Sequence, residues 1–357
     1  MTGAERIITA LKRQQPDRVP TMEWVLNPDV TEAITGDRDQ IKFAKKMGVD
    51  AVSVSLNYTK QTIDDKHFMD EWGVTRISYD EYPTPVAYPI KEESDFDSFN
   101  VPDPDAEHRF DSIRQALKEA EGEVGVVARV KDVFSQPRDM MGFENFLMSF
   151  YLQPELAARL MEMCVEHSSR IGHNLKELGV EAVVIGDDIA NNTGLLMRPE
   201  MYVEQVYPYF KRLVQNLKAE GLYVIKHSDG DLRAVLPELV DSGIDCLDPI
   251  DPLGDMDIAY MKQTYGNRIA LKGNIDCVKT LVEKPLMDVR RETARCILDA
   301  SLFGGHIISS SNSIHKGIKP QNYKYFLEQT HELGVYPLDV AALAKIANDE
   351  KQQIKLK

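Results

Sequence analysis

The sequence predicts an α/β fold, a (β/α)8 TIM-type barrel with an N-terminal extension and a hairpin insertion. Short, near-continuous apolar runs alternate with longer amphipathic segments, as expected for parallel strands that are buried on both faces and separated by helices. Eight such runs fit a closed barrel. Neither GxGxxG nor GxxxxGK[ST] follows any of them, which removes the usual nucleotide-binding reason for a doubly wound sheet. Residues 1–357 are therefore predicted to form one barrel domain.

The eight predicted strands are rich in β-branched residues. They cover residues 18–24, 51–56, 124–130, 182–187, 222–227, 245–249, 269–275 and 306–312. Helices are predicted between the strands from apolar residues three and four positions apart, most clearly over 154–178. The segment 199–221 begins with a proline and ends at a glycine, and 231–243 also closes on glycine, as helices often do.

Three regions depart from this alternation. Residues 72–100 carry three prolines and two β-rich runs, which predict a hairpin insertion followed by the start of a helix. Residues 131–153 are rich in methionine and phenylalanine and predict short helices. A helical tail is expected over about 339–357, with a frayed lysine-rich end, KQQIKLK.

Composition restricts the classes of function. Lys and Arg number 42 against 57 Asp and Glu, a net charge of −15, which disfavours binding to nucleic acid because phosphates would be repelled. Four cysteines without a CxxC pair do not suggest a disulfide scaffold. The N-terminus lacks the apolar core of a signal peptide, and no apolar stretch is long enough to span a membrane. We therefore expect a cytoplasmic protein with no membrane contact.

In such a barrel the chemistry lies at the C-terminal ends of the strands. Most of the predicted strands deliver an acid, an imidazole or a thiol at that end. The candidate site residues there are Glu23, Trp24, Asn57, Arg129, Asp187, Asp188, His227, Asp229, Asn274, Cys277, Asn312 and His315.

Three clusters among these residues are the most informative. GDDIANNTG (186–194) places two adjacent carboxylates after an apolar strand, although one of them could cap the next helix. KHSDGD (226–231) places His227 and Asp229 two positions apart, on the same side of an extended chain, which is a spacing for a divalent-metal ligand pair. An aspartate in that stretch could instead cap the helix that follows. IISSSNSIHKG (307–317) could bind an anion or form a polar loop.

These residues alone leave the reaction open. Carboxylates, a histidine and amides around a barrel mouth suit metal-assisted hydrolysis, decarboxylation, aldol chemistry or methyl transfer. The chain has no nucleophile elbow and no HExxH motif.

A set of longer motifs adds a resemblance to a known family. The motifs are RVP at 18–20, GDDIANNTG, PEMYVEQVYPYFKRL, IKHSDGDL, PIDPLGDMDI, LKGNIDC and SSSNSIHKGIKPQNY. Together they resemble the uroporphyrinogen decarboxylase superfamily over nearly the whole chain. The resemblance implies a barrel with one cleft at the strand C-terminal ends. It also implies one of two activities, porphyrinogen decarboxylation or methyl transfer with a cobalamin-carrying corrinoid protein.

Departures from the family pattern favour methyl transfer. The decarboxylases carry an arginine-rich segment for the substrate carboxylates, whereas the matching stretch here, VPTMEWVLNPDV, has no arginine and contains Glu23. In the methyltransferase branch a histidine and two cysteines hold a zinc ion. His227 keeps the histidine, but Asp229 and Asn312 stand at the cysteine positions. Harder ligands suit an oxygen substrate better than a thiol.

The motifs KHSDGD, GNIDC and SSSNSIH look like those of family members associated with O-demethylation of methoxylated aromatics. The resemblance implies a methyltransferase that moves a methyl group from a small methylated compound to the cobalamin of a partner corrinoid protein, since this chain has no DxHxxG motif of its own. Zn²⁺ is the implied metal, and a homodimer is compatible with the resemblance. The alternatives are a decarboxylase acting on a porphyrinogen or small carboxylate and a non-catalytic tetrapyrrole-binding protein.

The same resemblance implies roles for the candidate residues. Activation of the leaving oxygen, by a metal or a proton, falls to Asp187, Asp188, His227 and Asp229. A substrate-binding role falls to Glu23, Trp24, Asn57, Arg129, Asn274, Asn312 and His315. Cys277 is a further metal ligand, beside His227 and Asp229, or else a small buried residue at the start of a helix.

Overall fold

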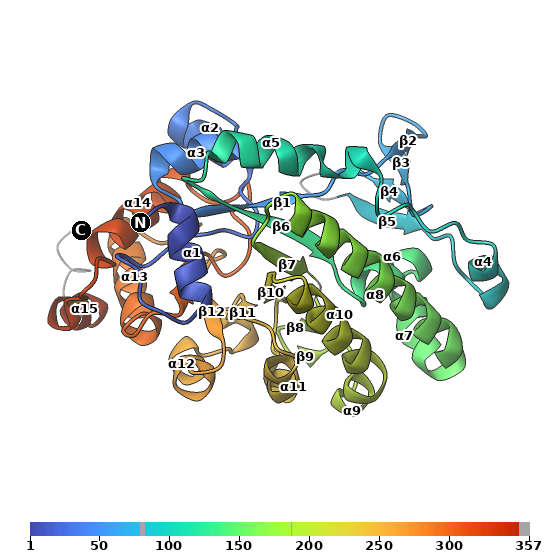
Figure 1. Ribbon diagram of the computed structural model, residues 1–357. Helices are drawn as coiled ribbons and strands as arrows, with labels where there is room; N and C mark the ends of the chain where they lie inside the picture. The colour runs from blue at the N-terminus through green and yellow to red at the C-terminus, as the bar shows by residue number, and fades with distance from the viewer. Residues whose placement is uncertain (79–82, 187, 350–357) are drawn as a thin grey trace.

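Across residues 1–78, 83–186 and 188–349, which the computed structural model describes, seven parallel strands form one curved sheet surrounded by helices (Figure 1). In spatial order the strands are β1 (Ala51–Ser55), β6 (Gly125–Lys131), β7 (Ala182–Gly186), β10 (Tyr223–His227), β11 (Cys246–Asp248), β12 (Ala270–Lys272) and β13 (His306–Ile307). Neighbouring strands follow one another along the chain, as in a barrel wound in one direction. The predicted α/β barrel class is therefore confirmed.

The predicted first strand, 18–24, is the main departure from eight regular strands. This segment takes the eighth place through isolated parallel bridges, Thr21 to Ile308 on one side and Met22 to Ala51 on the other. Pro20 has no N–H to donate, so a continuous ladder cannot form, and its carbonyl instead accepts from the Ile308 N–H at 2.9 Å. The prediction of a regular strand was wrong, but the segment does join the two edges of the sheet.

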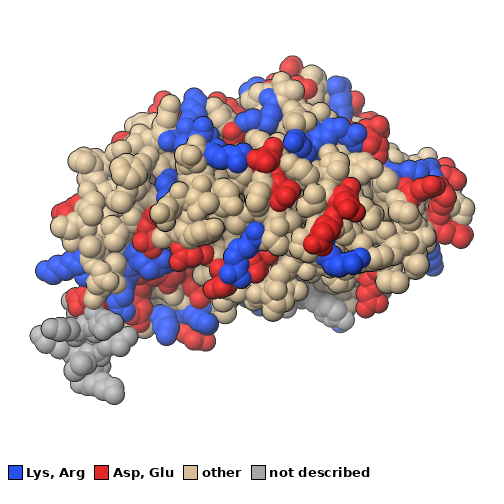
Figure 2. All heavy atoms as spheres, turned by 90° about the horizontal axis from the view of Figure 1, so that it is seen from below, with Lys and Arg blue, Asp and Glu red and all other residues tan. Residues whose placement is uncertain are grey.

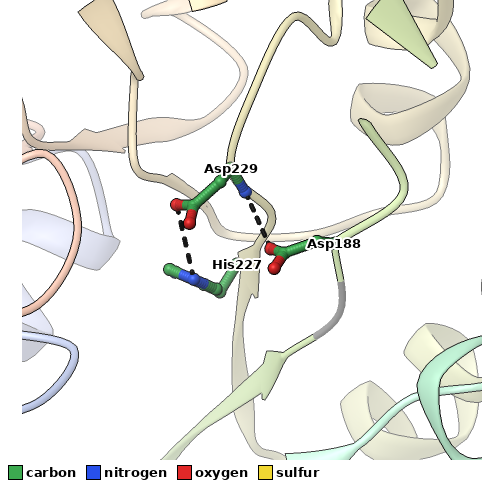
Figure 3. Close-up of side chains that lie close together, drawn as sticks. All are labelled: Asp188, His227 and Asp229. Carbon is green, nitrogen blue, oxygen red and sulfur yellow. Dashed lines mark hydrogen bonds and ion pairs between the residues drawn. The ribbon is translucent and has the colours of Figure 1, made fainter. Parts of the chain in front are cut away.

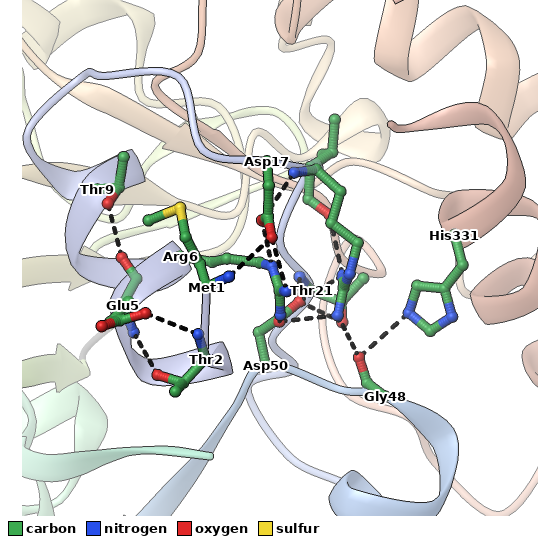
Figure 4. A network of polar contacts seen from close by, with 12 residues as sticks. Met1, Thr2, Glu5, Arg6, Thr9, Asp17, Thr21, Gly48, Asp50 and His331 are labelled. Atoms are coloured by element: carbon green, nitrogen blue, oxygen red, sulfur yellow. Dashed lines mark hydrogen bonds and ion pairs between the residues drawn. The ribbon is translucent and has the colours of Figure 1, made fainter. Parts of the chain in front are cut away.

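A buried carboxylate fixes this segment at the N-terminal end of the barrel (Figure 4). Asp50, directly before β1, is 1% exposed and accepts from Arg6 Nη1 at 3.0 Å and from Arg18 Nη1 at 2.7 Å. The backbone N–H of Thr21 also donates to Asp50, at 2.9 Å. Arg6 further pairs with Asp17, which is largely exposed. One acid thus ties the N-terminal helix and the closing segment to β1.

The N-terminal extension forms α1 (Gly3–Leu11), which covers the N-terminal end of the barrel. Its apolar residues Ile7, Ala10 and Leu11 pack against inward-facing strand residues in a separate core cluster. The larger core lies between the sheet and the outer helices. With both of these spaces filled by side chains, the polar strand ends at the opposite side of the barrel are left for a functional site.

The outer helices and short turns follow the strands in order. They are α2 (Pro28–Thr35), α3 (Gln40–Met47), η1 (Glu107–Phe110), α5 (Asp111–Ala120), α6 (Ser135–Met141), α7 (Phe143–Leu152), α8 (Pro154–Glu177), η3 (Arg233–Val235), α11 (Leu236–Asp241), η4 (Pro252–Gly254), α12 (Ile258–Tyr265), α13 (Leu286–Ala300) and α14 (Pro320–Leu333). The predicted short helices over 131–153 correspond to α6 and α7. The strands β8 (Ala190–Asn191) and β9 (Gly194–Leu195) pair in a small ribbon after β7.

The helix predicted over 199–221 is interrupted. It consists of α9 (Pro199–Met201), a π turn η2 (Tyr202–Val206) and α10 (Tyr207–Ala219). Pro208 lies two positions after the end of the π turn, and its missing N–H explains why regular α-helical bonding breaks there. At the other end of the chain, α15 (Val340–Ala347) lies within the predicted tail, while KQQIKLK (351–357) lies outside the described residues.

The insertion differs from the predicted hairpin over 72–100. In the described part of the chain it is an antiparallel sheet of β2 (Lys60–Thr62), β3 (His67–Asp70), β4 (Thr75–Ile77) and β5 (Thr84–Ala87), followed by α4 (Glu93–Asp97). The prediction missed β2 and β3, which both precede residue 72. Lys60–Thr62 is fully polar and exposed, so it carries no hydrophobic alternation. Figure 1 shows this sheet beside the end of β1, away from both termini.

The described surface carries both signs of charge. On the face shown in Figure 2, Lys and Arg side chains lie next to Asp and Glu side chains, with broad uncharged areas between them. Many of these charges are ion pairs between exposed groups, such as Arg268 with Asp241. Within the described residues, no helix is both long enough and apolar enough to cross a membrane.

Candidate functional site

Three predicted residues converge at the C-terminal ends of β7 and β10. One ligand atom each from Asp188, His227 and Asp229 lies within 4.8 Å of the other two (Figure 3). The backbone N–H of Asp229 donates to Asp188 Oδ1 at 3.0 Å, and His227 Nε2 lies 3.7 Å from Asp229 Oδ1. His227 is the last residue of β10, and its register neighbour on β7 is Gly186, so parallel pairing brings the two strand ends together. We call this group the Asp188–His227–Asp229 cluster.

Two contacts fix the imidazole of His227, one to the face of its ring and one to its Nδ1 atom. Its ring stacks on Trp24, with centroids 4.0 Å apart and an interplanar angle of 6°. Its Nδ1 lies 2.9 Å from Asp248 Oδ2 on the next strand. A side chain at Gly186 would prevent the stacking, since a Cβ there would lie 2.5 Å from the Trp24 indole. With Nδ1 bonded to a carboxylate, Nε2 is the nitrogen directed toward Asp229.

Asp248 links the histidine to a buried lysine. Lys272 Nζ lies 2.6 Å from Asp248 Oδ1, and both side chains are almost completely buried. Burial alone would raise the pKa of Asp248, but Lys272 and His227 outweigh it and lower that pKa. Burial opposes protonation of His227, yet the hydrogen-bonded Asp248 carboxylate raises the pKa of the imidazole overall. A chain of ion pairs therefore runs from Lys272 through Asp248 to His227 at the strand ends.

Asp229 is the carboxylate that the protein leaves incompletely bonded. Asn312 Nδ2 donates to its Oδ2. Its Oδ1 is buried and has no hydrogen-bond partner among the described residues. Burial raises the pKa of Asp229 to about 7, against the lowering effect of His227. Such an oxygen is suited to a proton or to a metal cation as its missing partner.

The donor set of the cluster fits a zinc ion. One imidazole nitrogen and two carboxylate oxygens are all groups that bind Zn²⁺, and three protein ligands leave a fourth position open for a reacting molecule. Asp248 supplies the partner that a metal-binding histidine normally has at its other nitrogen. The unpartnered Oδ1 of Asp229 is the observation in this structure that favours a cation at this place.

Glu23 provides a second buried acid on the closing segment. It is 3% exposed and accepts from the backbone N–H of Ser310 at 3.1 and 3.2 Å and from the Ser310 hydroxyl at 2.6 Å. Burial raises its pKa to about 7, although Lys272 and Ser310 lower it. Near neutral pH this acid is therefore present in both its protonated and its ionised form.

Cys277 lies near the cluster without belonging to it. Its thiol accepts a hydrogen bond from Ser311 Oγ at 3.4 Å, and burial raises its pKa to about 11. Among the described residues, the group of ligand atoms within 4.8 Å contains Asp188 where the sequence suggested Cys277. A ligand role for Cys277 remains a prediction. Asp187 lies outside the described residues.

Other predicted binding residues have structural partners of their own. Asn57 Oδ1 accepts from the Ser112 N–H at 2.9 Å, at the start of α5. His315 Nε2 lies 3.2 Å from the carbonyl oxygen of Cys277 in another loop, and its Nδ1 accepts from the Gly317 N–H. The side chain of Asn274 accepts from Arg295 at 3.3 Å. Asn57, Asn274 and His315 thus hold loops in place, and their role toward a substrate remains a prediction.

Asp248 and Lys272 belong to the site but carried no predicted role, and Ser310 was predicted only as part of the stretch 307–317 that could bind an anion. Lys272 had a recognisable signal, because a lysine inside the apolar run IALKGNI must be paired if the strand is buried. The pairing of Ser310 with Glu23 joins residues 287 positions apart and has no local signal.

A cavity of about 450 Å³ lies beside the cluster, at the ends of β1, β6 and β7. Trp24 and Gly186 line it, as do Asn57 and Arg129, whose guanidinium lies 5.6 Å from the Trp24 ring. The residues of the Asp188–His227–Asp229 cluster are not part of its lining, but Trp24 contacts both the cavity and His227. The insertion and α8 complete its wall through Trp72 and other residues.

The fold of this chain is similar to that of a solved structure, and its sequence is similar to those of curated proteins. A structure described as a methyltransferase from Methanosarcina mazei superposes with a TM-score of 0.73 over 93% of this chain and 99% of the other, at 15% identity, which shows a shared fold. A curated methylated-thiol–coenzyme M methyltransferase of Methanosarcina mazei is 22% identical over 62% of this chain and 57% of its own length.

Longer matches come from curated uroporphyrinogen decarboxylases. The protein from Alkalilimnicola ehrlichii is 25% identical over 92% of this chain and 94% of its own length. The protein from Myxococcus xanthus is 27% identical over 93% and 97%. The family model described as uroporphyrinogen decarboxylase (URO-D) matches residues 73–333, which is well over half of the sequence. From this match, the chain belongs to the uroporphyrinogen decarboxylase family.

Proposed function

We propose that this chain is a methyltransferase that takes a methyl group from a small methylated compound, a methoxylated aromatic, and passes it to the cobalamin of a separate corrinoid protein. The observation that carries the proposal is the Asp188–His227–Asp229 cluster, with a buried Asp229 oxygen that has no hydrogen-bond partner among the described residues. The similarity to a methylated-thiol–coenzyme M methyltransferase supports the same class of reaction.

Breaking a methyl–oxygen bond requires the leaving oxygen to be protonated or bound by a Lewis acid. Zn²⁺ held by Asp188, His227 and Asp229 would supply that Lewis acid. The chain's own residues would orient the imidazole of His227 and protonate the leaving oxygen. Asp248 holds His227 Nδ1 so that Nε2 faces Asp229. Glu23, whose burial raises its pKa to about 7, would hold a proton at its carboxyl group for the leaving oxygen.

The second candidate is decarboxylation, which the long matches to curated uroporphyrinogen decarboxylases favour. The charge of the site argues against a polyanionic porphyrinogen. Glu23, Asp188 and Asp229 are acids near the strand ends, and the buried lysine there, Lys272, is already paired with Asp248. A substrate with many carboxylates needs unpaired cations at these positions.

One assay separates the candidates. Purified protein with Zn²⁺ is incubated with free cob(I)alamin and a series of methoxylated arenes, and methylcobalamin is followed by its absorbance. Parallel reactions with uroporphyrinogen measure released CO₂. Methyl transfer predicts methylcobalamin from at least one donor and no CO₂. Release of CO₂ without methylcobalamin would replace methyl transfer by decarboxylation. Tetrapyrrole binding without either product would instead favour a storage protein.

A matched pair of variants tests the cluster in the same assay. Asp229→Asn should lower the rate about 100-fold or more, as expected for loss of a group that activates the leaving oxygen. Asp231→Asn serves as the control, because this neighbouring acid pairs with the exposed Arg233 instead of joining the cluster. Equal rates for the two variants would exclude Asp229 from the reaction.

A further inference from the structure

The cavity beside the cluster is built mainly from three parts of the fold. Strand ends of β1, β6 and β7 form its floor, residues of β3, β4 and the turn between them form one wall, and α8 forms another. Its volume of about 450 Å³ suits one small ligand rather than a tetrapyrrole with eight carboxylate side chains. The residues that line the cavity therefore indicate which class of substrate the proposed methyltransferase binds.

Three large aromatic side chains belong to this lining. The chain has two tryptophans, Trp24 and Trp72, and both line the cavity, together with Tyr58. Trp72 also packs edge-on against His167, with centroids 4.9 Å apart. Flat apolar surfaces of this kind favour a planar ring, which stacks on them with little loss of conformational entropy.

The cationic side chains of the lining are already engaged within the protein. Arg76 pairs with Asp70 at 2.7 Å and with Asp139 at 2.9 Å. Arg109 pairs with Glu71 and also donates to the Asp103 carbonyl.

The other two cations of the described lining are engaged as well. Lys131 Nζ lies 3.6 Å from Asp139. Arg129 lies over Trp24 and has a further polar or electrostatic partner. A carboxylate entering the cavity would lose its hydration and would have to compete with existing partners for a cation.

Buried nitrogen atoms in the wall have no hydrogen-bond partner among the described residues, among them Gln136 Nε2 and His167 Nε2. Gln136, at 3% exposure, lines the cavity, and its Nε2 has no hydrogen-bond partner among the described residues. A buried amide N–H without a partner marks a place where a water or a ligand oxygen completes the structure. An oxygen substituent on a ring would supply that acceptor.

We propose that this cavity binds the methyl donor as an uncharged single aromatic ring with oxygen substituents, stacked among Trp24, Trp72 and Tyr58 with one oxygen near Gln136, and that it excludes ring carboxylates. That the bound ring is the methyl donor rests on the proposed function. Binding of the ring itself needs neither a corrinoid protein nor a metal. Trp24 lines the cavity and stacks on His227, so this side chain connects the cavity with the cluster.

Intrinsic tryptophan fluorescence provides the test, because both tryptophans line the cavity. The full chain, without metal or corrinoid, is titrated at pH 7 with 2-methoxyphenol, with its carboxylated counterpart 4-hydroxy-3-methoxybenzoate, and with 2-methoxycyclohexanol. We expect saturable quenching by 2-methoxyphenol and at least about tenfold weaker binding of the ionised benzoate and of the non-planar ring. Equal or tighter binding of the benzoate would overturn the uncharged class, and no quenching by any probe would overturn the cavity as the binding site.

Variants locate the polar contact. Gln136→Leu should weaken binding of 2-methoxyphenol several-fold, whereas Gln115→Leu, on the exposed face of α5, should leave it unchanged. Unchanged binding in a folded Gln136→Leu protein would remove Gln136 from the site. If 2-methoxyphenol binds but no donor of the series gives methylcobalamin, the proposed function fails while the cavity assignment stands. Methylcobalamin formation without quenching would contradict the cavity alone.

Discussion

At the scale of single residues, His227 depends on Asp248 for its orientation and its charge. Asp248 also neutralises the charge of Lys272, and both side chains of that ion pair are almost completely buried. Replacing the acid removes a hydrogen-bond acceptor from the imidazole and leaves a buried ammonium without its counter-ion. The effect should therefore reach both the chemistry of the cluster and the stability of the barrel.

We predict that Asp248→Asn lowers the free energy of unfolding by about 3–5 kcal/mol, because it leaves the buried ammonium of Lys272 without its counter-ion. It should also lower the pKa of His227, because the Asp248 carboxylate raises it in the native protein. Urea unfolding and the pH titration of the imidazole by NMR measure the two effects. Asp241→Asn, at an exposed pair with Arg268, should cost less than about 1 kcal/mol. Similar costs for both variants would contradict the buried-pair account.

Glu23 gives a prediction in the pH dependence of stability. Its pKa rises from 4.5 to about 7 on folding because of burial, so the native state binds more protons than the unfolded state between these values. The contribution of Glu23 to unfolding free energy therefore falls as pH rises through this window. Glu23→Gln should be less stable than wild type at pH 5 and should recover relative to it by pH 8. Glu177→Gln, on the exposed face of α8, should show no such trend.

At the scale of elements, the closing segment at residues 18–26 depends on a few hydrogen bonds and one carboxylate. Its parallel bridges to both edges of the sheet are isolated, so backbone pairing alone provides little stability. Asp50 compensates by accepting from Arg6, from Arg18 and from the Thr21 N–H. Since Glu23 and Trp24 lie within this segment, its anchoring also fixes two residues of the site.

We predict that Asp50→Asn costs about 2–3 kcal/mol of stability and increases hydrogen exchange in residues 18–26. Asp17→Asn is the matched control, since Asp17 also pairs with Arg6 but its side chain is 44% exposed. The control should cost less than about 1 kcal/mol. Faster exchange throughout the barrel, instead of in this segment, would show that Asp50 acts on the whole fold.

The elements also show where sequence patterns are informative. Buried parallel strands such as Ala182–Gly186 and Tyr223–His227 are apolar runs, and they were predicted to within one residue. The segment around Pro20 and the polar strand Lys60–Thr62 were mispredicted or missed, because a proline breaks the ladder and an exposed edge strand has no apolar face. Tertiary contacts, rather than local pattern, decide the structure there.

At the scale of the whole molecule, the barrel brings together residues that the sequence could only name one by one. His227 and Asp229 were predictable as a pair from their spacing, and the structure adds Asp188 to them. The orientation of His227 by Asp248 and the pairing of Glu23 with Ser310 depend on strand order and register across the closed barrel. Such contacts between distant residues leave no local trace in a single sequence.

The central claim is that the Asp188–His227–Asp229 cluster binds the metal at which the leaving oxygen is activated. The most direct measurement is titration of metal-free protein with Co²⁺, followed by its visible spectrum and by competition with Zn²⁺. The account predicts one bound ion per chain, which Zn²⁺ displaces and which His227→Ala abolishes, while His108→Ala on the exposed surface retains it. Absence of a bound ion, or the same stoichiometry and spectrum in His227→Ala, would contradict it.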